Sequence, residues 1–216
     1  MKRGFFLIFC TYAIVISILI CIFIGNFSYL FTNEDYFVKQ LEKHGSFDRV
    51  EYAEGTNKVV IDYLQGKSDV VLSLDSFNER EKSHLVDVKV LIEHVYTVFY
   101  SSLVILLVCL LLLLRFDSQF YSTLKSILLY TGLSVIGLGL LLGLFSLVFS
   151  STFSVFHQVF FKSGTWLFNP TDTLILLYPF VFFKEFFVRI VWDSVLVGIF
   201  FVLFSFVLRY FTTNVK

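Results

Sequence analysis

The sequence predicts an all-α polytopic membrane protein with four transmembrane helices and a small outward-facing soluble domain between spans 1 and 2. Three observations support this fold class. The chain of 216 residues is 57% hydrophobic and 19% aromatic, which is more apolar than an ordinary soluble domain. The apolar residues gather in long runs, and a helix of about 20 such residues spans about 30 Å of hydrocarbon. Most of the acidic residues lie between positions 26 and 94, which is typical of a segment in water.

The first apolar run, residues 5–25, follows Lys2 and Arg3. It is longer than the core of ~7–15 residues found in signal peptides, and no A-x-A cleavage site comes after it. We therefore interpret residues 1–25 as a retained N-terminal transmembrane helix.

Residues 26–75 are expected to form the extracytoplasmic domain. Asn33 is suited to cap a first helix that stops near Gly45, and Asn57 to cap a second that stops at Gly66. About fifty residues are marginal for an independent core. The domain is therefore expected to rest on the helix that follows it and on the membrane surface.

A long helix is predicted for residues 76–114. The preceding residues 70–72, Val-Val-Leu, are suited to a short strand. The S-x-x-E pattern of Ser76–Glu79 is a capping box, and neither Gly nor Pro follows it before Gly132. The first half of the helix is polar and the second half, from Val95, is apolar. We interpret it as a polar helical post that continues into transmembrane helix 2.

The second half of the chain holds two further spans. Its predicted segments are a cytoplasmic turn at 115–126, transmembrane helix 3 at 127–150, an outer segment at 151–188, transmembrane helix 4 at 189–210 and a cytoplasmic tail at 211–216. Gly139 and Gly143 make a small-xxx-small step that favours close helix packing. The outer segment is rich in aromatic residues and is interrupted by Gly164, Pro170 and Pro179, so we interpret it as interfacial and partly re-entrant.

The distribution of basic residues predicts the orientation. One side of the membrane would carry Lys2, Arg3, Arg115, Lys125, Arg209 and Lys216. Asp117 is the one acidic residue predicted to lie on that side, against these six basic residues. The positive-inside rule then puts both termini in the cytoplasm of a cell-membrane protein and the functional histidines on the outer face.

Several classes of function find no support. Cys10, Cys21 and Cys109 lie inside apolar runs and match no metal or redox spacing, so they are expected to act as small hydrophobic residues. No metal motif, nucleotide-binding loop or G-x-S-x-G pattern is present, so no cofactor is predicted. Nor is there a basic stripe with interleaved aromatics, so nucleic acid is not an expected partner.

Two histidines stand out when they are considered together. His84 and Asp87 share a helix face, and His157 lies in the aromatic outer segment near Asp172. Taken singly, each histidine is more often an exposed or interfacial ring. Two imidazoles on one side of a membrane, each near a carboxylate that could hold its tautomer, favour acid–base chemistry. The other two histidines are expected to be structural: His44 at the solvated surface, and His94 bonded to a neighbouring helix.

Two strings carry a specific resemblance. FNEREKSHLVDVK at 77–89 and FHQVFFKSGTWLFNPTDTLILLYPFVFF at 156–183 resemble the Lit family, the lipoprotein intramolecular transacylases of Gram-positive bacteria. The resemblance covers the whole chain in length and in the number and order of spans. It implies that the sn-2 acyl chain of a lipoprotein's S-diacylglyceryl-cysteine moves to the α-amino group of the same cysteine, which gives a lyso-form lipoprotein.

The resemblance also implies site residues and partners. The two catalytic histidines of the family correspond to His84 and His157. Other polar or aromatic residues of the strings are candidates for binding or orienting substrate: Asp87, Lys89, Lys162, Trp166, Asn169 and Asp172. The implied partners are diacylglyceryl-modified lipoproteins and membrane phospholipid. The alternative from another class is a non-enzymatic membrane chaperone or transporter subunit that binds lipid or lipoprotein.

The surroundings predict different roles for the two histidines. His157 lies among aromatic residues, where a charged ring is poorly solvated, so a neutral base is favoured. His84 follows Glu81 and precedes Asp87. These two carboxylates would favour the charged form of the His84 ring, and therefore a role as the acid. The two roles can also be exchanged.

Overall fold

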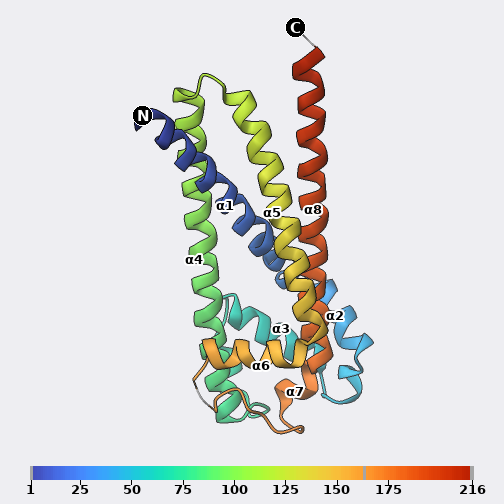
Figure 1. Cartoon of the computed structure of the whole chain (residues 1–216). Coiled ribbons are helices and arrows are strands. Elements are labelled where there is room, and N and C mark those ends of the chain that lie inside the picture. Colours follow the sequence, from blue (N-terminus) through green and yellow to red (C-terminus); the bar gives the residue numbers. More distant parts are fainter. Residues whose placement is uncertain (1, 163, 215–216) are drawn as a thin grey trace. The chain divides into compact units, whose positions relative to one another are not determined.

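A computed structural model describes residues 2–162 and 164–214, and each regular element in these residues is a helix (Figure 1). The long helices are α1 (Lys2–Phe31), α4 (Glu79–Phe116), α5 (Phe120–Leu147) and α8 (Phe180–Asn214). The short ones are α2 (Glu34–Lys43), η1 (Ser46–Asp48), α3 (Ala53–Leu64), η2 (Val70–Ser73), α6 (Phe149–Phe160) and α7 (Thr173–Leu177). The four long helices are apolar and long enough to cross a membrane. The predicted all-α fold with four candidate spans is thereby confirmed.

The chain divides into two compact units. Unit 1 comprises Met1–Phe27, Tyr96–Leu144 and Ile190–Lys216, and unit 2 comprises Ser28–Val95 and Phe145–Arg189. Unit 1 therefore contains the most apolar parts of the long helices, and unit 2 contains all the short helices.

The core of unit 1 includes two of the three cysteines. Cys10 of α1 and Cys109 of α4 are buried in a cluster with Ile14, Leu113 and Ile127. They pack there as small hydrophobic side chains, as expected. A polar contact adds to this packing between α1 and α8, because the Asn26 side-chain amide donates to the Ser194 hydroxyl at 2.9 Å.

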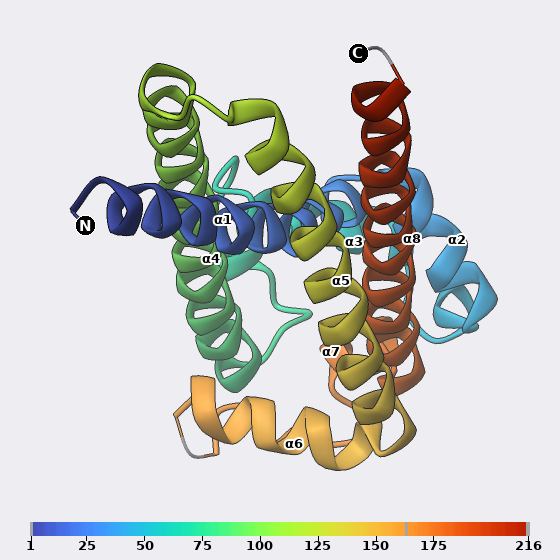
Figure 2. The ribbon, with the colours of Figure 1, turned by 45° about the horizontal axis from the view of Figure 1, so that its top comes forward.

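Glycines let α5 and α8 approach closely, and the two helices lie side by side in both views (Figures 1 and 2). A Cβ atom on Gly132 would come within 2.6 Å of the Gly198 carbonyl oxygen, and one on Gly139 would clash with Val195. A Cβ on Gly143 would meet nothing within 4 Å. The close contact with α8 therefore involves Gly139 and, about two helical turns earlier, Gly132, and the prediction for Gly143 is wrong.

The helices of the soluble segment follow their capping signals in part. The Asn33 side chain accepts a hydrogen bond from the Tyr36 backbone N–H at 2.9 Å and starts α2 as predicted. Gly45 and Gly66 follow α2 and α3 with positive φ, which suits a residue without Cβ. However, α3 begins at Ala53, ahead of the predicted cap. Asn57 is instead a buried residue within that helix.

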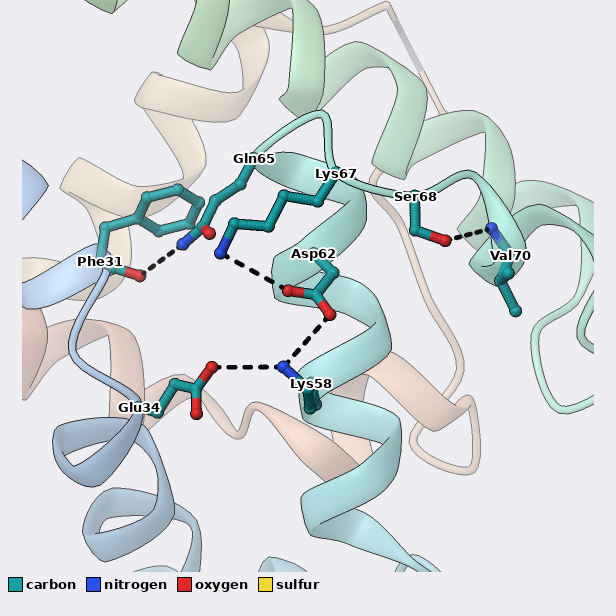
Figure 3. Close-up of polar contacts among 8 residues, drawn as sticks. All are labelled: Phe31, Glu34, Lys58, Asp62, Gln65, Lys67, Ser68 and Val70. Atoms are coloured by element: carbon teal, nitrogen blue, oxygen red, sulfur yellow. Dashed lines mark hydrogen bonds and ion pairs between the residues drawn. The ribbon is translucent and has the colours of Figure 1, made fainter.

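An ion pair connects α3 to the start of α2 (Figure 3). The Lys58 ammonium lies 3.3 Å from carboxylate oxygens of both Glu34 and Asp62. The Gln65 side-chain amide donates to the Phe31 carbonyl oxygen at 3.5 Å. The Lys58–Glu34 pair between the two helices is exposed, so it adds little stability.

The segment 28–75 shares its core with the later part of unit 2. The Phe37 ring packs against Phe182 with a centroid distance of 5.5 Å. The Ser46 hydroxyl donates to the Leu177 carbonyl oxygen at 2.9 Å, and the buried Tyr178 hydroxyl donates to the Asn57 side chain at 2.8 Å. A segment too short for its own core thus completes it with α7 and the start of α8.

The predicted strand at 70–72 is wrong, because these residues form the 3₁₀-helix η2. A strand requires a partner for its backbone groups, and the described residues contain no second strand. A 3₁₀ turn satisfies part of this backbone locally while it buries Val71 completely.

The long helices extend beyond the predicted apolar limits. α1 continues to Phe31, α5 already begins at Phe120, and α8 begins at Phe180, directly after Pro179. Hydropathy marks only the apolar part of a helix, whereas the helix itself continues as long as its backbone hydrogen bonds do.

Candidate active site

A cap at the start of α4 orients the helix that carries His84. The Asn78 side-chain oxygen accepts hydrogen bonds from the backbone N–H groups of Arg80 and Glu81, at 3.0 and 3.1 Å. In return, the Glu81 carboxylate accepts one from the Asn78 N–H at 2.8 Å. The capping box is therefore Asn78–Glu81, two residues later than the predicted Ser76–Glu79 box.

His84 is a buried residue one turn after this cap, with 8% of its surface exposed. Its ring meets Phe161 edge-on at a centroid distance of 4.8 Å and Phe168 at 5.3 Å. The predicted effect of Glu81 on this ring is wrong, because that carboxylate is bonded to backbone N–H groups instead. Burial against aromatic rings disfavours a positive charge on His84.

His157 lies near the end of α6 and is equally buried. Its Nδ1 lies 2.7 Å from the Phe153 carbonyl oxygen. A carbonyl oxygen can only accept, so Nδ1 carries the proton and the neutral ring has its lone pair on Nε2. The rings of Phe153 and Trp166 lie 4.1 and 5.0 Å from the imidazole. Burial lowers the pKa of His157, and the Phe153 hydrogen bond opposes that change in part.

The two histidines come together within unit 2. Their ring centroids are 5.9 Å apart and the ring planes differ by 22°. Two imidazolium ions at this distance would repel each other in a poorly solvated site. The arrangement therefore favours neutral rings, and a neutral imidazole can accept a proton and later return it.

Among the other predicted site residues, Trp166 joins the pair through its contact with His157. Lys89 does not: its ammonium pairs with Asp69 at 3.2 Å and lies 4.4 Å from the centre of the Tyr63 ring. The side chain of Lys162 is exposed. Lys89 is thus engaged elsewhere on unit 2, whereas Lys162 directly follows Phe161, whose ring contacts both histidines.

The predicted carboxylates differ in their surroundings. Asp172 was expected to hold the tautomer of a histidine, but its oxygens accept hydrogen bonds from the Asn78 side chain at 3.1 Å and the Asn169 N–H at 2.7 Å. The hydrogen bond of Asn169 to Asp172 is therefore donated by its backbone N–H. Asp87 has one buried oxygen, Oδ2, with no hydrogen-bond partner among the described residues.

The two remaining histidines lie outside the pair. His44 is more buried than predicted, and its Nε2 contacts the Glu185 carboxylate at 3.3 Å. His94 is exposed and bonds the Val90 carbonyl oxygen of its own helix at 2.8 Å, rather than a neighbouring helix.

Several residues of the site were not predicted individually. Phe153, Phe161 and Phe168 line the imidazoles, and Glu81 is buried one helical turn before His84. The aromatic residues belong to the aromatic-rich outer segment, but composition does not indicate which rings turn inward. In the sequence, the buried position of Glu81 is indicated only by the N-x-x-E pattern of Asn78–Glu81, a second possible capping box that overlaps the S-x-x-E pattern of Ser76–Glu79.

Two other features of the structure bear on the chemistry. No three His, Cys, Asp or Glu side chains in residues 2–162 and 164–214 are grouped to hold a metal ion. A cleft of about 920 Å³ lies among α2, η1 and α3, and its lining includes Glu34, Glu51 and Glu54 but neither histidine of the pair.

Comparison with protein families matches residues 4–183 to the family described as lipoprotein intramolecular transacylase Lit. A curated relative, an uncharacterised protein of Aquifex aeolicus strain VF5, is 31% identical over 111 residues. This match covers 51% of the present chain and 47% of that relative, so the chain spans about half the length of the curated relative.

Solved structures with the same fold include the membrane integral lipoprotein intramolecular transacylase Lit of Bacillus cereus. It is 22% identical, with 97% of this chain and 99% of that chain covered and a TM-score of 0.83. A variant of the same protein, with a histidine replaced by arginine, is 21% identical with a TM-score of 0.79. That comparison covers 100% of this chain and 97% of the variant chain. Similarity at this level of identity establishes the fold.

Proposed function

We propose that this chain, which belongs to the Lit family of lipoprotein intramolecular transacylases, transfers an acyl chain within a single lipoprotein molecule. The sn-2 acyl group of an S-diacylglyceryl-cysteine moves to the α-amino group of that cysteine. An amide C–N bond forms and the ester C–O bond breaks. The glycerol oxygen gains a proton and the amine loses one, so the product is a lyso-form lipoprotein.

The observation that carries this proposal is the buried pair of His84 and His157, 5.9 Å apart. An N-terminal ammonium has a pKa of about 8 and must lose a proton before it attacks an ester. The departing glycerol oxygen must gain one. The free amine loses a second proton as the amide C–N bond forms. A neutral imidazole can accept this proton and return it to the glycerol oxygen, while the first proton leaves to solvent, so no covalent intermediate on the protein is needed.

We assign the base to His157. Its Nδ1–H is bonded to the Phe153 carbonyl, so the Nε2 lone pair is the position that can accept the proton of the attacking amine. The pKa of the ring is lowered by burial, which keeps it neutral and ready to accept. The carbonyl of Phe153 steadies the imidazolium that forms, as an orienting acceptor does in other acid–base pairs.

We assign to His84 the hydrogen bond to the developing oxyanion or to the leaving glycerol oxygen. Its Nδ1 is buried and has no partner among the described residues, so the ring is not committed to another protein group. A buried polar atom without a partner is uncommon, and a substrate oxygen would satisfy it. A donor directed at developing charge in a dry site is an effective form of transition-state stabilisation.

The aromatic surroundings suit an intramolecular substrate. Phe161, Phe168 and Trp166 contact the imidazoles and present apolar surface to the acyl and glyceryl groups. The amine and the ester belong to one molecule, so the site mainly has to hold them in a reactive arrangement. Well-oriented groups can reach effective concentrations on the order of 10⁵–10⁸ M.

We infer that both termini are cytoplasmic, that the histidine pair faces the outside of the cell membrane, and that residues 26–75 form the outward domain. The partners are diacylglyceryl-modified lipoproteins and membrane phospholipid. No cofactor or nucleic acid is required.

Mass spectrometry of a reporter lipoprotein tests the proposed reaction. The reporter would be produced in cells that lack the activity, with this chain, with its His157→Ala variant, or with neither. With the wild-type chain, one acyl group should move from the glyceryl group to the cysteine nitrogen while the mass of the lipopeptide stays constant, and fragmentation should locate the acyl group. A reporter that binds the chain but keeps both ester-linked chains would support the non-enzymatic lipid binder instead.

A further inference from the structure

Glu81 is an unusual residue because its carboxylate is buried, with 1% of the residue exposed. A buried carboxylate is costly unless its oxygens are hydrogen-bonded. One oxygen accepts the Asn78 N–H at 2.8 Å, within the cap of α4. The other accepts the Leu174 N–H of α7 at 2.7 Å. Glu81 thus joins two helix starts that lie far apart in the sequence.

Three further hydrogen bonds connect the same two segments. The Arg80 guanidinium donates to the Leu167 carbonyl oxygen at 2.8 Å, and the Thr173 hydroxyl donates to the Ser76 carbonyl oxygen at 2.5 Å. The Asn78 side chain donates to Asp172 at 3.1 Å. We call this set of contacts between residues 76–81 and 167–174 the clasp.

Within the clasp a side chain of α4 caps α7, and the residues that precede the two helices are hydrogen-bonded to each other. Asp172 is the N-cap residue of α7, but its side chain makes no capping bond to that helix. It accepts from Asn78, the cap residue of α4, while Glu81 of α4 accepts the N–H of Leu174. The start of α7 is therefore defined by a side chain of α4, and loss of the Glu81 carboxylate would leave a buried backbone N–H without its acceptor.

The clasp holds the segment that lines the histidine pair. Phe168 is adjacent to Leu167, whose carbonyl is tied to Arg80, and its ring lies 5.3 Å from His84. Trp166 lies on the other side of Leu167, and its ring is 5.0 Å from His157. Glu81 itself precedes His84 by one helical turn. A shift of α7 relative to the start of α4 would consequently move aromatic rings away from both imidazoles.

We propose that Glu81 is a positioning residue for acyl transfer, because its carboxylate holds the Trp166–Phe168 segment against His157 and His84. The inference that this position affects acyl transfer rests on the proposed function. The position of the segment itself can be tested separately. Glu81 does not touch the reacting atoms in this scheme, and it acts through the rings that confine the substrate.

The test is the Glu81→Gln substitution in a Trp192→Phe background, where Trp166 is the remaining tryptophan. The introduced amide retains the shape of the side chain but presents an N–H₂ group to one of the two backbone N–H donors, so one donor loses its acceptor. The transfer rate at saturating reporter lipoprotein should fall by about 10–100-fold, as expected for misplacement of a confined substrate. The Trp166 fluorescence should shift to longer wavelength as the half-buried indole becomes more hydrated.

Glu79→Gln is the matched control, because Glu79 lies in the same helical turn with 91% of its side chain exposed. It should keep both the rate and the emission of the background protein. Arg80→Ala provides a second variant in case Glu81→Gln does not fold. It removes an exposed contact of the clasp and should shift both quantities in the same direction by smaller amounts.

The outcomes separate the two proposals. A background protein that transfers no acyl group would refute the proposed function, while the emission comparison would still report on the segment. Unchanged emission in folded Glu81→Gln protein would overturn the positioning of Trp166. A shifted emission with a rate within twofold of the background would show that this position does not matter for catalysis, and the inference would again be overturned.

Discussion

The hydrogen bond from His157 to Phe153 is the most informative contact at the scale of single residues. It joins Nδ1 to a carbonyl oxygen of the same helix at 2.7 Å, so the tautomer is determined by α6 alone. Asp172, the carboxylate expected to do this, is engaged with Asn78 instead. The proposed base is therefore oriented by main chain, and Asp172 serves the structure.

Replacement of either histidine tests the acid–base pair. His157→Ala and His84→Ala should each lower the transfer rate by about 10²–10⁴-fold, which is the usual contribution of a general acid or base. The double variant should be little slower than either single variant, because groups that act as a unit are not additive. His94→Ala is the matched control, since its exposed ring bonds its own helix, and it should keep the wild-type rate.

Near-normal transfer by a well-folded His157→Ala protein would contradict the base assignment. Reporter mass spectrometry gives the rate, and circular dichroism in detergent confirms that each variant is folded.

The lowered pKa of His157 predicts how protonation affects the protein. The folded-state pKa lies below the unfolded value of about 6.5, so protonation costs the folded state more than the unfolded chain. Above about pH 6.5, protonation of this residue should therefore not affect the free energy of unfolding. As the pH falls from there toward the lowered pKa, it should reduce that free energy. The His157 ring should stay neutral, and able to act as a base, throughout that interval.

Nuclear magnetic resonance of histidine-labelled protein can measure this titration. The signal that disappears in a His157→Asn variant should titrate with a midpoint below about 6.5, the ordinary value for histidine. A midpoint at or above that value would show that burial does not dominate the surroundings of the ring.

At the scale of elements, the contact between α5 and α8 depends on backbone proximity. Gly132→Ala should destabilise the protein by about 1–3 kcal/mol, because the new methyl group would meet the Gly198 carbonyl oxygen and Val202 in a packed contact. Gly137→Ala on the same helix should be neutral, since its methyl group would meet nothing within 4 Å. Thermal unfolding in detergent compares the two variants, and equal midpoints would refute the close approach at Gly132.

The short helices show why isolated signals only partly predict elements. Asn33 caps α2 as its sequence indicates. In contrast, α3 begins ahead of its predicted cap, and Asn57 is buried where it accepts a bond from Tyr178. A tertiary partner for the Asn57 side chain thus outweighed its local preference for a helix start.

At the scale of the whole molecule, the distribution of charge predicts orientation. Reporter fusions at Gly55 should be active outside the membrane, and a fusion at Ser118 should be active in the cytoplasm, because basic residues flank the short turn and the chain ends. Fusions with alkaline phosphatase and green fluorescent protein distinguish the two sides, since each is active on only one of them. A cytoplasmic Gly55 would overturn the orientation and the access of the histidine pair to lipoproteins.

The sequence by itself determined the class of the protein, the number and order of its candidate spans and its family. These properties follow from apolar runs and short sequence strings, which can be recognised without knowing which segments pack together. A long apolar run must be helical in lipid because its backbone groups have no other partners there, and two strings were specific enough to indicate the family. The same strings drew attention to His84 and His157, the two buried histidines that form the ring pair.

Only the tertiary structure decided which side chains meet. The carboxylate of Glu81 bonds Leu174 and not His84, Asp172 bonds Asn78, and Gly132 rather than Gly143 joins Gly139 in the contact with α8. Sequence periodicity defines the face of a helix but not the partner of that face, because the partner depends on how segments far apart in the chain pack. A buried charge or an orphan backbone N–H is then satisfied by whichever group that packing brings within reach.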